Sequence, residues 1–153
     1  MPNRDVDDYN VVMTQPVSVR FRDQRVAERL RLESATRGRS NSALAEELID
    51  EGLRQRHHPL VTFRDGTRGR RPALIGGPDL WEVIDGIVGG DVPPAQRVGR
   101  AADLFGLRRA EVDAALAYYA EFTDEVDAEI SANRVAAAEA EAQWRRRNDL
   151  LAH

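Results

Sequence analysis

The chain has 153 residues, among them 22 arginines, no lysine and no cysteine, and its 26 acidic residues give a formal net charge of -4. This length allows one domain of ordinary size or two small ones. The missing cysteines exclude disulfide scaffolds, the usual zinc fingers and thiol nucleophiles. No apolar run reaches the roughly 18 residues of a membrane span. We therefore expect a soluble, cytoplasmic protein without a membrane partner.

The charges are distributed unevenly along the chain. Residues 16–39 hold seven arginines and three acidic residues, a local charge of +4, whereas residues 111–130 hold seven acidic residues and no basic one. Affinity for nucleic acid depends on local phosphate contacts rather than on the mean charge of the chain. The basic segment therefore keeps nucleic acid open as a partner, although solvated faces of ordinary helices would explain the same charge runs.

The first elements are predicted from local signals. Residues 1–15 are polar, and we expect a disordered arm there. Residues 17–21 alternate apolar and polar side chains, which is the pattern of a half-buried strand. Asp23 can cap a first helix that ends at Gly38, and Ser40 can cap a second one. The predicted order is strand, helix, turn, helix.

A unit of about forty residues with this order is too small to build a hydrophobic core alone. A homodimer solves the problem if the two strands pair antiparallel and four helices pack beneath them. The apolar strand residues then face the helices, while Ser18 and Arg20 project from a two-stranded ribbon that fits the major groove of DNA. A ribbon that serves only dimerisation is the alternative interpretation.

Residues 17–21, residues 38–44 (GRSNSAL) and Leu48-Ile49 together resemble the ribbon-helix-helix family, which includes Arc, MetJ and CopG. The resemblance implies that residues 16–57 form a dimeric domain that binds operator DNA. It implies base contacts from Ser18 and Arg20. It also implies phosphate contacts from the following residues: Arg22, Arg39, Ser40 and Asn41.

The middle of the chain is predicted to form a second small domain, residues 58–130. Short strands are expected on either side of an arginine-rich loop, residues 64–71, which could reach a DNA backbone, and three helices follow. Ala102, Gly106 and Val112 have the spacing of a helix-turn-helix. Acidic side chains follow at the start of its second helix, so we do not expect this helix to bind DNA.

The same stretch resembles a small winged-helix-like domain found in bacterial antitoxins of the VapB-like type. The resemblance rests on the His58-Pro59 start, the short strands before Gly76-Gly77, the helix after Asp79 and residues 114–119 (AALAYY). In that type the partner is a toxin, commonly a PIN-like ribonuclease. The resemblance therefore implies a cognate toxin as a partner.

The last segment, residues 131–153, is predicted to be a helical toxin-binding tail. Apolar or small side chains recur every seven residues along one face, Trp144 suits an interface anchor, and the arginines beside it suit an acidic groove such as the active site of a metal-dependent nuclease. A tail that folds back on its own domain, or that makes a dimer contact, is the alternative. The predicted toxin-binding residues are Ile130, Ala137, Trp144, Arg145, Arg146, Arg147 and Leu151.

No set of residues in the sequence has the spacing of an active site, a metal site or a cofactor site. His57 and His58 adjoin each other in a predicted linker, where we expect both to be exposed. We therefore expect no enzyme, no metal and no cofactor.

The sequence as a whole predicts a mainly α protein: an N-terminal ribbon-helix-helix (β-α-α, dimeric), a small helix-turn-helix or winged-helix-like domain, and a C-terminal helical tail. The predicted function is that of an antitoxin of a type II toxin-antitoxin system, which binds operator DNA as a dimer, represses its own operon and neutralises a toxin. Two alternatives remain: a stand-alone ribbon-helix-helix regulator without a toxin, and an interaction module that never meets DNA.

Overall fold

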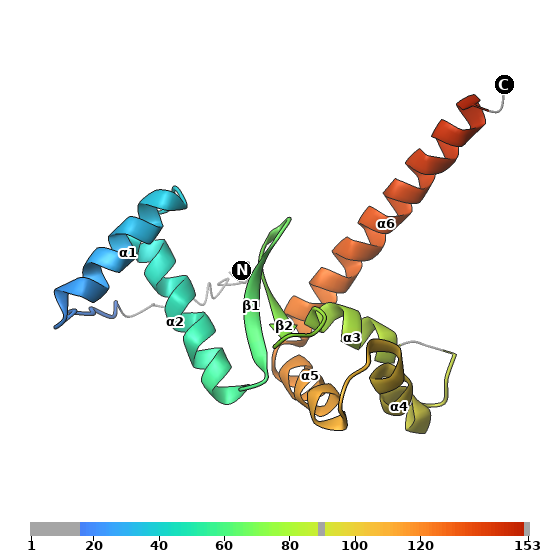
Figure 1. The fold of residues 1–153 in the computed structure, drawn as a ribbon, viewed down its shortest axis with the longest axis horizontal. Coiled ribbons are helices and arrows are strands. Elements are labelled where there is room, and N and C mark those ends of the chain that lie inside the picture. Colours follow the sequence, from blue (N-terminus) through green and yellow to red (C-terminus); the bar gives the residue numbers. More distant parts are fainter. Residues whose placement is uncertain (1–15, 89–90, 152–153) are drawn as a thin grey trace, which may run out of the picture. The chain divides into compact units, whose positions relative to one another are not determined.

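The computed structural model of the chain describes residues 16–88 and 91–151, so the predicted arm of residues 1–15 lies outside the described residues. The chain divides into two compact units, residues 1–45 and 46–153. The described elements are α1 (Gln24–Thr36), α2 (Asn41–His57), β1 (Val61–Gly66), β2 (Gly69–Leu74), α3 (Leu80–Ile87), α4 (Pro94–Phe105), α5 (Arg109–Glu121) and α6 (Thr123–Leu151) (Figure 1).

Capping residues set both ends of α1. The Asp23 carboxylate accepts a hydrogen bond from the Arg25 amide at 2.9 Å. Gly38 takes φ 62°, a left-handed conformation that glycine adopts without strain. The amide of Arg39 then donates back to the Ser34 carbonyl and closes the helix end. The predictions of a helix start at Asp23 and a helix end at Gly38 are confirmed.

The second helix begins as predicted, after Ser40. The Ser40 Oγ accepts from the Ala43 amide at 3.1 Å, which satisfies one of the free donors of the first turn. Leu44 is 1% exposed and is the one buried apolar side chain among residues 16–45 that the structure describes. The first unit therefore has almost no hydrophobic core of its own.

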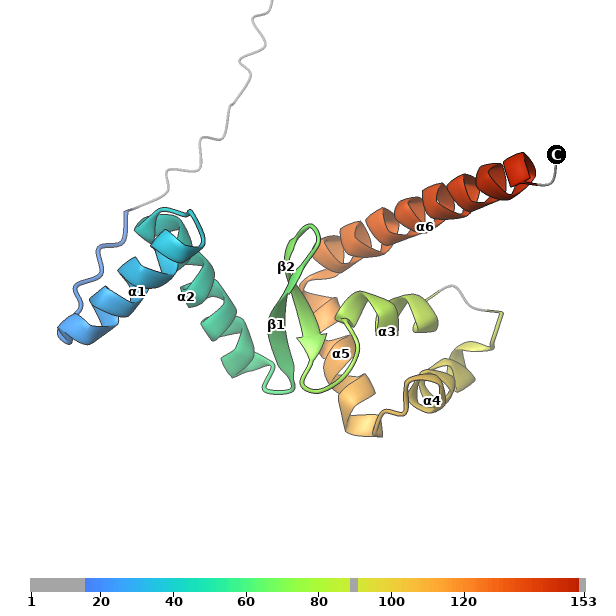
Figure 2. The same ribbon diagram turned by 45° about the horizontal axis from the view of Figure 1, so that its top comes forward.

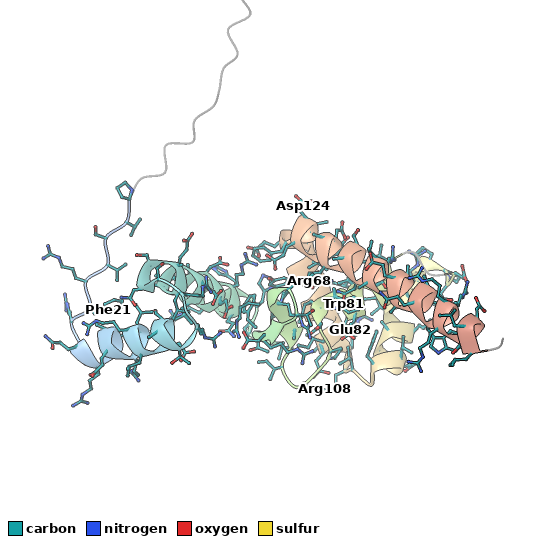
Figure 3. All side chains as sticks on the ribbon, turned by 90° about the horizontal axis from the view of Figure 1, so that it is seen from above. Phe21, Arg68, Trp81, Glu82, Arg108 and Asp124 are labelled. Carbon is teal, nitrogen blue, oxygen red and sulfur yellow. The ribbon has the colours of Figure 1, made fainter. Side chains whose placement is uncertain are left out.

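The predicted N-terminal strand is wrong, and the predicted β-α-α fold class is wrong with it. Residues 16–21 form no strand, and the two-stranded sheet of the described chain comes after α1 and α2. Val17 and Val19 are 87% and 57% exposed, and Phe21 also lies at the surface (Figure 3). Alternation gives a segment two faces, but a strand also needs a neighbour for its backbone hydrogen bonds, and no described strand pairs with this segment.

The sheet of the second unit is a hairpin of β1 and β2. Its antiparallel register pairs Val61 with Leu74 and Gly66 with Gly69, so a turn of two residues joins the strands. The predicted loop of residues 64–71 is therefore wrong, because most of those residues belong to the strands.

Helix α3 lies at the centre of the second unit. Leu80, Val83 and Ile84 are 0% exposed, and the helix packs against α4, α5, α6 and β2. The helix is short but strongly apolar, and Asp79 starts it with a reciprocal capping box to Glu82. The core around it consists of Val61, Leu74, Leu80, Val83, Ile84, Ile87, Ala101, Val112, Ala115, Tyr118, Val126 and Ile130.

The pair of helices predicted around Gly106 is present as α4 and α5. Gly106 ends α4 with φ 63°, and its amide donates to the Ala102 carbonyl. Val112 on α5 is 0% exposed and belongs to the core. The small residue, the glycine turn and the β-branched residue therefore have the structural roles that their spacing indicates.

Helix α6 continues well beyond this core. Val126 and Ile130, near its start, are buried, and the helix then runs to Leu151. Its C-terminal half extends away from the other helices of the second unit in both ribbon views (Figure 1, Figure 2). The predicted tail is thus the outer part of a helix whose beginning belongs to the core.

Candidate functional site

The arginines of residues 16–39, called the basic segment below, number seven against three acidic residues. Five of its seven arginines are exposed and form no ion pair with a residue that the structure describes: Arg20, Arg22, Arg25, Arg29 and Arg31. Arg37 does have a carboxylate partner, Glu33, at 2.6 Å. Positive charge without local compensation is the condition for binding an anionic polymer.

Helix α1 places two of these arginines side by side. Arg25 and Arg29 are four residues apart and so lie on one face of the helix. By helical geometry, this face is opposite to the one that carries Leu30 and Ser34. Leu30 is partly buried and Ser34 is buried, its hydroxyl donating to the Leu30 carbonyl at 2.7 Å. One side of α1 thus carries the partly buried and buried residues, and the opposite side presents two free guanidinium groups.

The predicted phosphate contacts are found at two places in the first unit. Arg22 is exposed just before α1. Arg39, Ser40 and Asn41 surround the start of α2, where the Arg39 guanidinium donates to the Ala43 carbonyl at 3.5 Å. The Ser40 side chain caps the helix, and the amides of the first turn that it leaves unused point toward the N-terminal end, as an anion would require.

The predicted base-contacting residues, Ser18 and Arg20, are both exposed and precede α1. The ribbon that was expected to align them is absent from the described residues. The predicted base contacts of Ser18 and Arg20 are therefore supported by the exposure of both side chains and by the charge of Arg20, and not by a strand geometry.

The arginines of the hairpin are bound to acidic residues of their own unit. Arg70 donates twice to the Glu51 carboxylate, at 2.8 Å from each nitrogen. Arg64 and Arg71 both pair with Asp79, whose side chain is 5% exposed. In the hairpin only Arg68, at the turn, is left without such a partner among the described residues (Figure 3). Because three of its four arginines are already paired with carboxylates, the hairpin has little free positive charge with which to bind phosphate.

The arginines at the start of α5 are also paired. Arg108 bonds the Glu111 carboxylate at 2.8 Å, and Arg109 bonds that of Asp113 at 2.9 Å. The Arg108 side chain and amide both stabilise the Glu111 carboxylate and lower its pKa. Both arginines are therefore already bound to carboxylates, and the expectation that this helix does not bind DNA stays a prediction.

A charged junction holds the C-terminal half of α2 to the second unit. Arg54 donates to the Tyr118 hydroxyl at 2.9 Å and to Glu125 at 2.6 Å, and its guanidinium lies 4.2 Å from the centre of the Phe122 ring. Burial raises the pKa of the Tyr118 hydroxyl. The junction is a structural contact, because the side chains of Arg54, Tyr118 and Glu125 form hydrogen bonds with one another.

The expectation of two exposed histidines is wrong for His58. Its side chain is 9% exposed, and its Nε2 lies 2.8 Å from a Glu121 carboxylate oxygen. The ring also contacts Tyr118 and Phe122 edge-on. No local sequence pattern predicts this contact, because Glu121 lies 63 positions further along the chain.

The predicted toxin-binding residues separate into two groups. Ile130 is 8% exposed and belongs to the core, whereas Trp144 and Leu151 are 62% and 76% exposed. Arg145 pairs with Glu141, but Arg146 and Arg147 have no carboxylate partner in the described part of the chain. By helical geometry, Ala137 and Trp144 continue the face on which Ile130 is buried. The outer half of α6 thus presents an apolar face without a covering element and two free arginines.

Among the described residues, no group of three or more His, Cys, Asp or Glu side chains is arranged to hold a metal ion. No helix in the same residues has the length and apolar character needed to cross a membrane.

Comparisons of the chain with protein-family models, with curated proteins and with solved structures find no match.

Proposed function

We propose that the protein is a DNA-binding antitoxin. In this proposal two copies bind an operator and repress their own operon, and the outer half of α6 binds and neutralises a toxin. The PIN-like ribonuclease class remains the proposed partner, on the resemblance of residues 58–130.

The observation that carries the DNA-binding part is the different pairing of arginines in the two units. In the basic segment five of seven arginines lack an acidic partner within the described residues, whereas eight of the fourteen arginines of the second unit are paired with carboxylates. An arginine already bound to a carboxylate must break that contact before it can bind phosphate. The free arginines release counterions from DNA at no such cost.

Within this proposal the residues have different roles. Arg25 and Arg29, on the outward face of α1, and Arg22 bind phosphates and set the affinity. Arg20 is the proposed base contact, with Ser18 beside it, since arginine can bond guanine through two hydrogen bonds. Arg39, Ser40 and Asn41 hold a further phosphate at the start of α2.

The toxin-binding part is supported by the exposed half of α6. Trp144 is 62% exposed on a helix with no covering element, and Leu150 and Leu151 further along it are 80% and 76% exposed, so this part of α6 offers apolar surface that a partner can bury. Arg146 and Arg147 lie within one turn of Trp144 and suit an acidic pocket on that partner. Co-purification of the native complex, with identification of the bound protein by mass, tests this part of the proposal.

The stand-alone regulator without a toxin is the second candidate. It is favoured by the same free arginines, which need no toxin to bind DNA. A native preparation that binds DNA but contains no partner nuclease would favour this candidate over the antitoxin.

The decisive experiment for DNA binding compares two arginine pairs. The variant R25A/R29A is expected to weaken binding to a fragment from upstream of the gene. It should also reduce the slope of log affinity against log salt by about 4, because each of the two copies loses about two phosphate contacts. The matched control R108A/R109A removes the same charge from the paired arginines of α5 and should change neither quantity. Equal losses in both variants, measured by fluorescence anisotropy, would show that binding follows total charge and not the basic segment.

A further inference from the structure

The C-terminal half of α2, residues 46–57, has its polar and apolar faces reversed relative to an ordinary surface helix. Toward its own unit it presents charged side chains, with Glu51 bound to Arg70 and Arg54 bound to Glu125. Away from the unit it presents three large apolar side chains, Leu48, Ile49 and Leu53, which are 50%, 50% and 56% exposed. A helix at a protein surface normally buries its apolar face. This reversal leaves an apolar face at the surface that a second molecule could bury.

The outward face carries charges in a defined order. Glu46, Ile49, Leu53 and Arg56 are separated by three, four and three residues, so they form one line along the helix. Glu46 and Arg56 are both exposed, and neither forms an ion pair with a described residue. Gly52 borders this line, and a Cβ there would meet nothing within 4 Å. A helix-interior glycine without a neighbour in its own chain leaves room for a second helix to approach closely.

We propose that this face binds the same face of a second copy, with the two α2 helices antiparallel about a twofold axis. The order acid, apolar, apolar, base is complementary to its own reverse. Ile49 then packs on the partner's Leu53, and Glu46 meets the partner's Arg56, with each contact made twice. A parallel arrangement would instead place Glu46 against Glu46 and Arg56 against Arg56, which like charges disfavour.

The inference rests on the two-copy part of the proposed function and names the surface that joins the copies. It requires no strand in residues 16–21. It also assigns a second role to the junction at Arg54, which keeps the polar side of α2 on the second unit and so leaves the apolar side free for the partner.

Sedimentation velocity on the full chain tests the interface. The wild type is expected to be a dimer, and L53R should raise the dimer dissociation constant by about tenfold or more, because a charge enters the centre of the contact twice. The matched control L104R changes another exposed leucine, 65% exposed on α4, and should leave the dissociation constant unchanged. Circular dichroism is used to check that both variants retain the helical content of the wild type.

A charge exchange tests the antiparallel arrangement. E46R alone should weaken the dimer by about tenfold, and E46R/R56E should restore it, because the exchange rebuilds both symmetric pairs. Failure of the double variant to recover would exclude the antiparallel contact.

The outcomes also separate this inference from the proposed function. A wild-type monomer would overturn both the interface and the two-copy operator binding. A dimer that L53R leaves intact would overturn the interface alone, whether or not DNA binding persists. Loss of toxin capture by L53R, with the dimer unchanged, would show that another protein occupies the face and would also overturn the inference.

Discussion

At the scale of single residues, Arg54 makes the contacts that bind α2 to the rest of its unit. Its side chain is 19% exposed and reaches Asp50, Tyr118 and Glu125. Removal of this partly buried cation takes a hydrogen-bond partner from both Tyr118 and Glu125, which costs more than the loss of an exposed pair. Arg109, whose side chain is 74% exposed and pairs within its own helix, is the corresponding exposed case.

We therefore predict that R54A lowers the free energy of unfolding by about 2 to 3 kcal/mol. R109A should change it by less than about 0.5 kcal/mol, as exposed intrahelical pairs usually do. Urea unfolding followed by circular dichroism measures both values. A loss in R54A no larger than that in R109A would mean that the Arg54 contacts contribute no net stability.

At the scale of elements, glycines show how position decides the effect of one residue type. Gly106 ends α4 with φ 63°, in a region that residues with a Cβ avoid. Gly99 lies in the interior of the same helix, and a Cβ there would meet nothing within 4 Å. One glycine is therefore required by the backbone, whereas the other only weakens its helix.

The same substitution should thus have opposite effects at these two positions. We predict that G106A destabilises the protein by about 1 to 2 kcal/mol, because alanine must adopt the left-handed conformation. G99A should stabilise it by about 0.5 to 1 kcal/mol, which is the difference in helix propensity. The midpoints of urea unfolding at constant slope provide the measurement. A destabilised G99A would reveal that this position contacts another surface in solution.

The elements also show which structural features the sequence could predict. Asp23, Gly38, Ser40 and Gly106 were located correctly because a helix cap depends on bonds within a few residues. The strand of residues 17–21 was predicted wrongly because its existence depends on a partner strand that no local pattern can supply.

Contacts between residues distant in sequence account for the other errors. The arginines of residues 64–71 suggested a polar loop, but Glu51 and Asp79 bind them and allow the strands to extend to the turn. The exposure of His58 was also predicted wrongly because its contact is distant in sequence. Its partner, Glu121, lies on α5. At the candidate site, the density of arginines could be predicted from the sequence. Which of them are free could not, because pairing depends on the acids that folding brings close.

At the scale of the whole molecule, the proposed functions are assigned to separate parts of the chain. The basic segment lies before residue 40, the core of the second unit includes residues up to Ile130, and the outer half of α6 follows. Arg134 does contact Asp85 of α3, but this pair is exposed and contributes little to stability. The tail can therefore be removed with little effect on the core.

We predict that deletion of residues 131–153 changes the unfolding free energy by less than about 1 kcal/mol, because Val126 and Ile130 remain in place. The truncated chain should bind operator DNA with the same affinity as the full chain, but it should no longer capture the neighbouring gene product. The full-length variant W144A serves as the finer test, since loss of a central aromatic anchor should weaken capture by about 2 kcal/mol or more. Calorimetric titration of the partner into each variant measures this, and tight capture by the truncated chain would assign toxin binding to another surface.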